Sequence, residues 1–401
     1  MKTYGLYPAD IWLPKEEYER WAVVACDQYT SEPEYWEEVE RYVGEVPSAL
    51  RITLPEAYLN DQPETRIKEI NATMRRYLEG EVLKELPSSM IYVERAQSNG
   101  RVRRGLVGMI DLEKYDYRPD VECAIRATEQ TVVERIPPRL KIRENAVLEL
   151  PHVLLMIDDP SGTVIETIAK KAETFPVAYD FDLMQQGGHI CGRVLDENSM
   201  EQVAVALSTL SGGDPDELLF VVGDGNHTLA TAKEWYRQHP TPLTRYALVE
   251  VVNIHDPSIE FEPIYRVMFG VNPEALIEEF TESYGVSNEA DAHVFTCLFG
   301  ETEQTLSLAH TAKLPVDTLQ TFLDEYLKRH PEASIDYIHG EDVVRRLSRE
   351  PNALGFLFDS IEKADLFPAV KADGALPRKS FSMGQAQDKR YYIECRKIRE
   401  D

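Results

Sequence analysis

Apolar residues recur at three- and four-residue steps in several segments of this chain, which is the pattern of a helix with one buried face. The clearest segment, residues 64–79, carries four such residues: Ile67, Ile70, Met74 and Leu78. Gly80 follows and can end the helix, because glycine adopts C-cap conformations without strain. Similar patterns or runs of helix formers predict helices at residues 34–43, 200–210, 228–237, 273–284, 316–327 and 341–349.

Short runs rich in β-branched and apolar residues lie between these helices and predict β-strands. Residues 90–96 and 101–112 form one predicted hairpin, because the Ser-Asn-Gly sequence at 98–100 tolerates a positive φ. Residues 152–157 and 163–168 lie on either side of a turn that contains aspartate, proline and glycine, and they predict a second pair of strands. Further strands are expected at residues 218–222, 246–252, 293–298, 353–358 and 390–395.

The order of these elements predicts an α+β fold with more than one domain. At 401 residues the chain is longer than one hydrophobic core usually supports. We expect three regions: an N-terminal α+β region with the hairpin at residues 1–118, a mixed α/β core at 119–268, and a C-terminal α+β region at 269–401.

Charge and cysteine content narrow the classes of function. The formal net charge of -27 repels nucleic-acid phosphates and anionic membrane surfaces, and no block of basic residues offsets it. We therefore expect a small-molecule or nucleotide ligand, with neither nucleic acid nor a membrane as partner, and the oligomeric state stays open. The five cysteines are odd in number and widely spaced, and the polar N-terminus lacks the pattern of a signal peptide. A cytoplasmic location is expected.

The turn Gly223-Asp224-Gly225, which follows a predicted strand, holds the most informative combination of residues. Glycine lets a ligand approach the backbone, and the free N–H groups of the helix start at Asn226 and His227 favour an anion such as phosphate. Asp224 offers a carboxylate to Mg²⁺, and His227 offers a hydrogen-bond donor. On spacing alone, an ordinary Asp-Gly turn with an N-capping side chain is the better interpretation.

Several common catalytic motifs are missing from the sequence. The chain contains no G-x-G-x-x-G, no P-loop pattern, no G-x-S-x-G and no H-E-x-x-H. These absences argue against a dinucleotide fold, a P-loop fold, a hydrolase fold and a structural zinc site. Cys26 is expected to be a buried inert thiol, since Asp27 beside it raises the pKa of that thiol.

Two segments resemble the sequence blocks of a known family. Residues 224–228, Asp-Gly-Asn-His-Thr, are similar to a D-G-H-H-R motif before a helix, and residues 125–131 are similar to an I-R-P-H-E-x-T segment. Both blocks are typical of the bacterial domain-of-unknown-function family one thousand and fifteen, within the ParB/sulfiredoxin-like superfamily that includes the ADP-dependent free serine kinase. The resemblance implies a ParB/sulfiredoxin-like core at residues 119–268. It also implies a phosphate- or nucleotide-binding enzyme, a phosphotransferase for a small hydroxylated metabolite that uses ADP or ATP with Mg²⁺.

The resemblance implies catalytic roles for three residues. Glu129 matches the position of a base that accepts the proton of the substrate hydroxyl. Asp224 matches a catalytic residue and metal ligand, and His227 a catalytic residue that stabilises charge on the transferred group. A surface glutamate beside Arg126 is the alternative interpretation of Glu129.

The implied phosphate contacts depart from the family pattern. Gly225, Asn226 and Thr228 are the predicted phosphate-binding residues of the turn, but Asn226 and Thr228 stand where the motif has histidine and arginine. The turn therefore lacks a cation that grips phosphate. Arg266 and Lys379, in two further blocks that resemble the family, are the predicted replacements, and ordinary surface cations are the alternative interpretation of both.

A second functional hypothesis stays open beside the enzyme. The chain is then a non-catalytic ligand-binding or interaction protein with an eroded ParB-like site. The two hypotheses differ in whether Glu129, Asp224, His227 and a compensating cation converge on one pocket.

Overall fold

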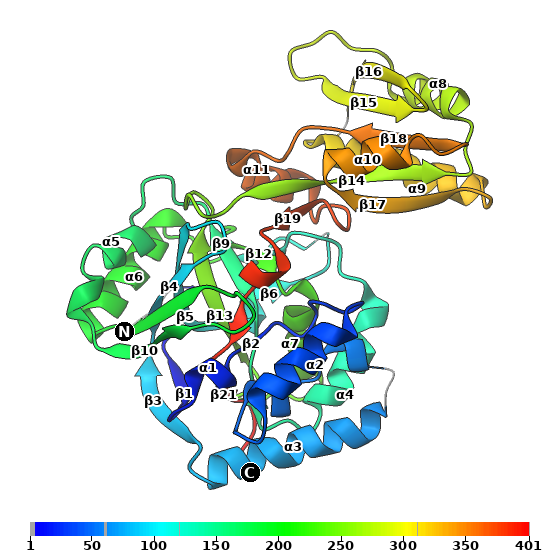
Figure 1. The fold of residues 1–401 in the computed structure, drawn as a ribbon. Coiled ribbons are helices and arrows are strands. Elements are labelled where there is room, and N and C mark those ends of the chain that lie inside the picture. The colour runs from blue at the N-terminus through cyan, green and yellow to red at the C-terminus, as the bar shows by residue number, and fades with distance from the viewer. Residues whose placement is uncertain (1–4, 60–61, 120, 311, 401) are drawn as a thin grey trace. The chain divides into compact units, whose positions relative to one another are not determined.

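The computed structural model describes residues 5–59, 62–119, 121–310 and 312–400 (Figure 1). The chain divides into two compact units, Met1–Ile259 together with Gly384–Asp401, and Glu260–Met383. The three regions expected from the sequence differ from this division, because one sheet takes strands from both sides of residue 118 and the last segment returns to the first unit. Helices and mixed sheets make the fold α+β, as predicted.

A nine-stranded mixed sheet forms the centre of the first unit (Figure 1). Its strands are β4 Ile91–Ala96, β5 Val102–Asp111, β6 Tyr115–Asp116, β7 Ile125–Ala127, β9 Leu154–Ile157, β10 Val177–Asp182, β11 His189–Val194, β12 Phe220–Asp224 and β13 Tyr246–Asn253. Their order across the sheet is β10-β11-β4-β5-β13-β9-β12-β7-β6. The predicted hairpin is confirmed as β4 and β5, with Ile91 opposite Val107. Strands β9 and β13 are buried almost throughout, which fits a sheet covered on both faces.

Seven α-helices are described in the first unit: α1 Tyr18–Trp21, α2 Pro33–Val43, α3 Pro63–Glu79, α4 Ile136–Arg143, α5 Ile165–Ala169, α6 Glu197–Leu210 and α7 Asn226–Gln238. The predicted helices at residues 34–43, 64–79, 200–210 and 228–237 are confirmed as α2, α3, α6 and α7.

The predicted strand at residues 163–168 is wrong, because this segment enters helix α5. Asp159 Oδ2 accepts hydrogen bonds from the backbone N–H groups of Thr163, at 2.6 Å, and Val164, at 2.8 Å. A side-chain acceptor at this place satisfies donors that a helix start leaves free. The turn residue thus begins a helix where a returning strand was expected.

The segment Gly384–Asp401, called here the C-terminal strap, completes the first unit through short strand pairs. The small sheets of this unit pair β2 Val23–Val24 with β20 Tyr391–Tyr392, β8 Leu148–Glu149 with β21 Arg396–Lys397, and β1 Ala9–Pro14 with β3 Leu83–Ser89. Of the strand predicted at residues 390–395, the two residues of β20 pair as a strand, and Cys395 forms an isolated β-bridge with Trp12.

Buried arginines fix the C-terminal strap in place. Arg390 donates to Glu250 at 2.8 Å and to Glu394 at 2.7 Å, and all three side chains are buried. Arg95 is fully buried and donates to the backbone carbonyl of Lys389 at 3.3 Å. Because buried charges are stable only when paired, these contacts tie the strap to the interior of the unit.

The second unit is an antiparallel sheet with four described helices. Its strands are β14 Phe261–Phe269, β15 His293–Phe299, β16 Thr302–Leu308, β17 Ser334–His339, β18 Ala353–Leu357 and β19 Phe381–Met383, in the order β16-β15-β18-β14-β17 with β19 beside β14. Its helices are α8 Pro273–Tyr284, α9 Pro315–Arg329, α10 Glu341–Leu347 and α11 Lys363–Asp373. The first three confirm predicted helices. Helix α11 was not predicted, because Pro368 lies inside it and no one-sided apolar pattern marks it.

Within the described parts of both units, no helix combines the length and the apolar character needed to cross a bilayer.

Candidate functional site

Two of the predicted catalytic residues lie at the carboxyl ends of neighbouring parallel strands of the large sheet. Strands β7 and β12 run parallel, and Ala127 of β7 lies opposite Val222 of β12. Asp224 is the last residue of β12 and Glu129 comes two residues after the end of β7, so both lie at the carboxyl ends of these two strands. The hydroxyl of Thr128 donates to the carbonyl of Val222 at 2.5 Å, which holds the two strand ends together.

The turn at Asp224 requires glycine at its next position. Gly225 has a φ of +82° and precedes the first residue of α7. A Cβ atom there would lie 3.0 Å from the Cα of Val153, closer than real Cβ contacts normally come. Asp224 Oδ1 accepts from the N–H of Gly225 at 2.9 Å. The backbone N–H groups in the first turn of α7, beginning at Asn226, have no acceptor within the helix and are free for an anion.

A lysine from the C-terminal strap supplies a cation at this turn. Lys389 Nζ lies 3.3 Å from Asp224 Oδ2, and both side chains are largely buried. The sequence left the turn without a phosphate-gripping charge, and Lys389 brings one from 165 positions along the chain. Its backbone is held by buried Arg95, so the ammonium group is presented from a fixed segment.

His227 is a neutral side chain in this setting. Burial, together with the charges of Arg139 and Arg135, lowers the pKa of its imidazole to about 4. Its Nε2 accepts a hydrogen bond from the backbone N–H of Val132 at 3.2 Å. The single proton of the neutral ring is therefore assigned to Nδ1 from the hydrogen bonding. His227 can donate a hydrogen bond without carrying charge.

An aspartate and a histidine that the sequence did not single out as catalytic lie near the same turn. His152 Nε2 is 3.4 Å from Asp27 Oδ2, and the Tyr392 hydroxyl is 2.9 Å from His152 Nδ1. Burial opposes charge on His152, but the carboxylates of Asp27 and, more weakly, Asp224 outweigh it and raise the pKa of that imidazole. Burial also opposes charge on Asp27, and His152 nevertheless lowers the pKa of that carboxyl. The two form a charged pair.

Cys26 is a thiol at neutral pH, as predicted. Burial, with Asp27 adding to it, raises the pKa of the thiol to about 11. The hydroxyl of Tyr392 donates to Cys26 Sγ at 3.0 Å. A thiol in this state is a poor nucleophile.

The two predicted replacement cations lie in the second unit. Arg266 is fully buried there, and its Nε donates to Gln320 Oε1 at 2.7 Å. Its guanidinium carbon lies 4.7 Å from the centre of the Tyr337 ring. Lys379 Nζ lies 5.0 Å from the centre of the same ring. Arg266 is thus a core residue of the second unit, whereas Lys379 is exposed.

Sequence reasoning missed Lys389, His152 and the role of Asp27 for a physical reason. Asp27 was considered only for its effect on the pKa of Cys26, and His152 only marked the start of a predicted strand. Lys389 lies in a polar stretch with no motif around it. Their positions depend on strand β9 and on the strap, which are long-range features that local patterns do not encode.

No three His, Cys, Asp or Glu side chains among the residues that the structure describes gather closely enough to hold a metal ion. Asp224 presents one carboxylate, and Lys389 already pairs with it. It fits Mg²⁺ only where phosphate oxygens supply other ligands, which is how Mg²⁺ commonly binds with nucleotides.

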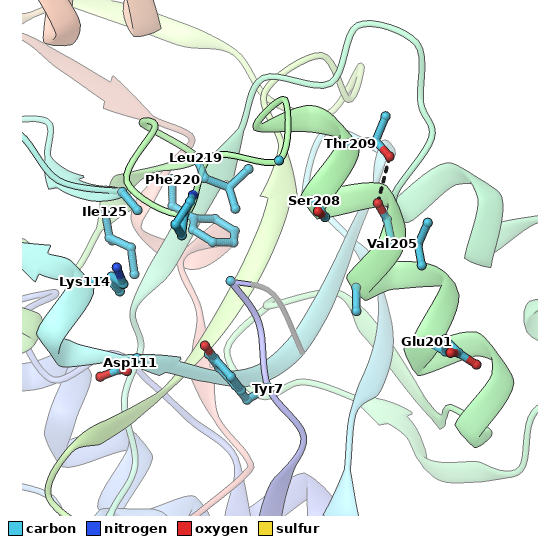
Figure 2. A pocket seen from close by; sticks show the side chains of 15 residues that line it. Tyr7, Asp111, Lys114, Ile125, Glu201, Val205, Ser208, Thr209, Leu219 and Phe220 are labelled. Atoms are coloured by element: carbon cyan, nitrogen blue, oxygen red, sulfur yellow. Dashed lines mark hydrogen bonds between the residues drawn. The ribbon is translucent and has the colours of Figure 1, made fainter. Parts of the chain in front are cut away.

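A separate cavity of about 770 Å³ lies at the amino ends of β7 and β12, away from the turn (Figure 2). Val205, Ser208 and Thr209 of α6 line one side of it, and Leu219 and Phe220 line another. None of the predicted site residues lines this cavity.

Comparison with known proteins gives a family but no assigned function. No curated protein is significantly similar in sequence. Among solved structures, the chain is similar to a free serine kinase mutant in complex with ADP, at 11% identity over 74% of this chain and 93% of that one, with a TM-score of 0.42. It is also similar to a conserved hypothetical protein from Pyrococcus furiosus, at 12% identity over 72% and 94% of the two chains with a TM-score of 0.39. It is similar as well to SbnI from Staphylococcus aureus with a C-terminal truncation, at 12% identity over 69% of this chain and 82% of that one, with a TM-score of 0.36. A family model described as Protein of unknown function (DUF1015) matches residues 6–326, and the chain belongs to this family.

Proposed function

We propose that this protein is a phosphotransferase that binds a nucleotide at the Asp224 turn and acts on a small hydroxylated metabolite. One observation carries the proposal. Lys389 Nζ lies 3.3 Å from Oδ2 of Asp224, and Asp224 lies two residues before α7, whose first N–H groups are free. A helix start and a half-buried ammonium group together favour the negative charge of a phosphate.

Two buried polar atoms beside this turn fit the same ligand. Asn226 Oδ1 and Thr131 Oγ1 have less than 1 Å² exposed and no hydrogen-bond partner in the described structure. Buried polar atoms without a partner are rare in proteins and call for one. Asn226 directly precedes His227, and Thr131 directly precedes Val132, whose N–H donates to His227 Nε2. The Thr131 hydroxyl can rotate, and the Asn226 amide can flip, so that each donates a hydrogen bond to a phosphate or ribose oxygen.

The residues divide the work of phosphoryl transfer between them. Gly225 lets the phosphate approach the backbone, Thr228 lies in the first turn of α7, and neutral His227 donates a hydrogen bond from Nδ1. Glu129 accepts the proton of the substrate hydroxyl while that oxygen bonds to phosphorus and the bond from phosphorus to the leaving phosphate oxygen breaks. Lys389 offsets the charge that develops on the transferred group.

Asp224 is the residue that would hold a Mg²⁺ ion brought by the nucleotide. Such an ion would neutralise phosphate charge when bound. Lys389 would then pass from the carboxylate to the phosphate.

The test measures thermal stabilisation of the full chain by ADP and ATP, each with and without Mg²⁺. A ligand at one hundred times its dissociation constant stabilises the folded state by about 2.7 kcal/mol, which shifts the melting temperature by several degrees. We expect the shift in the wild type and its loss in Asp224→Asn and in Lys389→Gln.

The matched control is Asp216→Asn. Asp216 also pairs with a lysine, Lys114, at 2.7 Å in the first unit, but this pair is exposed, and Asp216 lies before the start of β12 whereas the turn lies at the other end of that strand. It should leave the nucleotide shift unchanged. A wild-type melting temperature that stays constant across both nucleotides refutes the proposal.

Binding without chemistry would support the alternative, a non-catalytic ligand-binding protein. ³¹P NMR of ATP or ADP with a mixture of small hydroxylated metabolites distinguishes the two. A new phosphate-ester signal that Glu129→Gln abolishes supports the transferase. Nucleotide binding with no new signal for any hydroxylated compound supports the alternative.

A further inference from the structure

Three cations gather around one aromatic ring in the second unit. The charged groups of Arg266, Arg378 and Lys379 lie 4.7, 5.7 and 5.0 Å from the centre of the Tyr337 ring. Arg266 is opposite Tyr337 across the pairing of β14 with β17, and it is fully buried, whereas Arg378 and Lys379 are exposed. We call Arg378, Lys379 and the Tyr337 ring the cationic patch.

The loop that carries the two exposed cations is held in a fixed shape. Arg378 Nε donates to the Tyr337 hydroxyl at 3.1 Å, and the hydroxyl of Ser380 donates to the carbonyl of Pro377 at 2.7 Å. Lys379 has a φ of +56°, a left-handed conformation that is costly for a residue with a side chain. Such strain persists where the surrounding contacts impose it, and it concentrates at functional positions.

The patch is short of negative charge. Neither Arg378 nor Lys379 forms an ion pair with a carboxylate among the described residues, although Asp324 is near enough to raise the pKa of Arg378 after the Tyr337 hydroxyl. Asp324 is itself hydrogen bonded to Gln320 at 2.9 Å. In a chain with a net charge of -27, two adjacent exposed cations without such an ion pair create a local attraction for an anion.

We propose that the cationic patch binds a phosphate group of a small molecule. Arg378 offers a planar fork of donors and Lys379 a mobile point charge, which together match the three oxygens of a phosphate. Arg266 is a positioning residue that supports the Tyr337 ring from the interior. The sequence predicted Arg266 and Lys379 as cations for a phosphate at the Asp224 turn, whereas the site proposed here is a separate one formed by Arg378 and Lys379. This site stands on contacts within the second unit and does not depend on the nucleotide site proposed at Asp224.

The test measures binding of pyrophosphate to the full chain by isothermal titration calorimetry. All proteins compared carry Lys389→Gln, which removes the cation of the phosphate site proposed at the Asp224 turn. We expect Arg378→Gln with Lys379→Gln to weaken binding by about tenfold or more, since charge-assisted hydrogen bonds are lost.

The control changes the same amount of charge on the same unit. Lys328 and Arg345 are exposed and paired with carboxylates, and replacing both with glutamine should change the affinity less than twofold. Equal weakening by both double variants would show a general charge effect and overturn the proposal, as would unchanged affinity in the patch variant.

A second variant separates the function of the loop from its folding. Lys379→Gly removes the strain at φ +56°, so we expect a higher melting temperature together with weaker pyrophosphate binding. Tighter binding by the glycine variant would contradict the assignment. Repeating the titration with ADP in place of pyrophosphate shows which kind of ligand carries the bound phosphate. Stronger binding of ADP indicates a nucleotide, and equal binding indicates recognition of the phosphate group alone.

Discussion

Replacement of Gly225 by alanine tests whether the turn at Asp224 has the tight geometry on which the site depends. The left-handed conformation at φ +82° costs alanine roughly 1–2 kcal/mol more than glycine. The new Cβ atom would also lie 3.0 Å from the backbone Cα of Val153 and 3.1 Å from its Cγ2. Val153 is buried directly before β9, so its backbone atoms yield little, and this overpacking adds about 1–2 kcal/mol. Lower entropy of the unfolded chain returns roughly 0.4–1 kcal/mol. We expect a net loss of about 2–3 kcal/mol.

Gly100 provides a matched control. Its φ of +78° is nearly the same, but no atom lies within 4 Å of the position of its Cβ. Gly100→Ala therefore carries the conformational cost alone, about 1 kcal/mol after the gain in the unfolded chain. The difference between the two variants isolates the contact with Val153.

Urea denaturation followed by tryptophan fluorescence measures both variants in the same unit. All four tryptophans belong to the first unit, at Trp12, Trp21, Trp36 and Trp235. The signal thus reports unfolding of the unit that contains the turn. If Gly225→Ala costs no more than Gly100→Ala, the close approach to Val153 is refuted, and with it the requirement for glycine beside Asp224.

Three further predictions concern charge in the first unit. Burial and two nearby arginines lower the pKa of His227 to about 4, below the unfolded value near 6.5, so the free energy of unfolding should fall as pH drops from 6.5 toward 4. His227→Gln should flatten this slope when urea titrations are repeated at each pH. The pKa of His152 is raised because Asp27 outweighs burial, so the stabilisation by this pair is fully present below about pH 6.5 and lost as pH rises through the folded pKa. Asp27→Asn should therefore destabilise the unit more at pH 6 than at pH 9, and an equal effect at both would exclude a charged His152. Arg390→Met removes the buried ion-pair partner of Glu394 and leaves Glu250 with Arg103 at 3.5 Å, so it should cost about 3–5 kcal/mol or prevent folding, whereas Lys15→Met, at an exposed pair, should cost under about 1 kcal/mol by the same assay.

Local patterns predicted those elements whose stability is decided locally. Helix α3 shows its apolar face in the sequence, and the β4–β5 hairpin shows its turn residues, so both were found. Helix α5 was missed because the capping role of Asp159 depends on where its side chain points. Helix α11 was missed because Pro368 lies inside it, and a proline in a helix interior is unfavourable unless tertiary packing compensates for it.

The candidate site divides in the same way. Asp224 and Gly225 were found because strand, turn and helix are contiguous in sequence. Lys389 and His152 were not, because the strap and strand β9 bring them to the turn only through buried ion pairs and sheet pairing. The placement of Glu129 at the same sheet edge as Asp224 follows from the parallel pairing of β7 with β12, which the sequence does not specify.

The return of the C-terminal strap to the first unit has a consequence for synthesis on the ribosome. Residues 260–383 emerge before residues 384–401, so the second unit has its whole sequence available while the first still lacks β20, β21 and Arg390, which pairs with Glu250. Nascent chains fold domain by domain as residues appear. The inserted unit can therefore reach its native state first, and the pairing of Lys389 with Asp224 must wait until the last segment has left the exit tunnel.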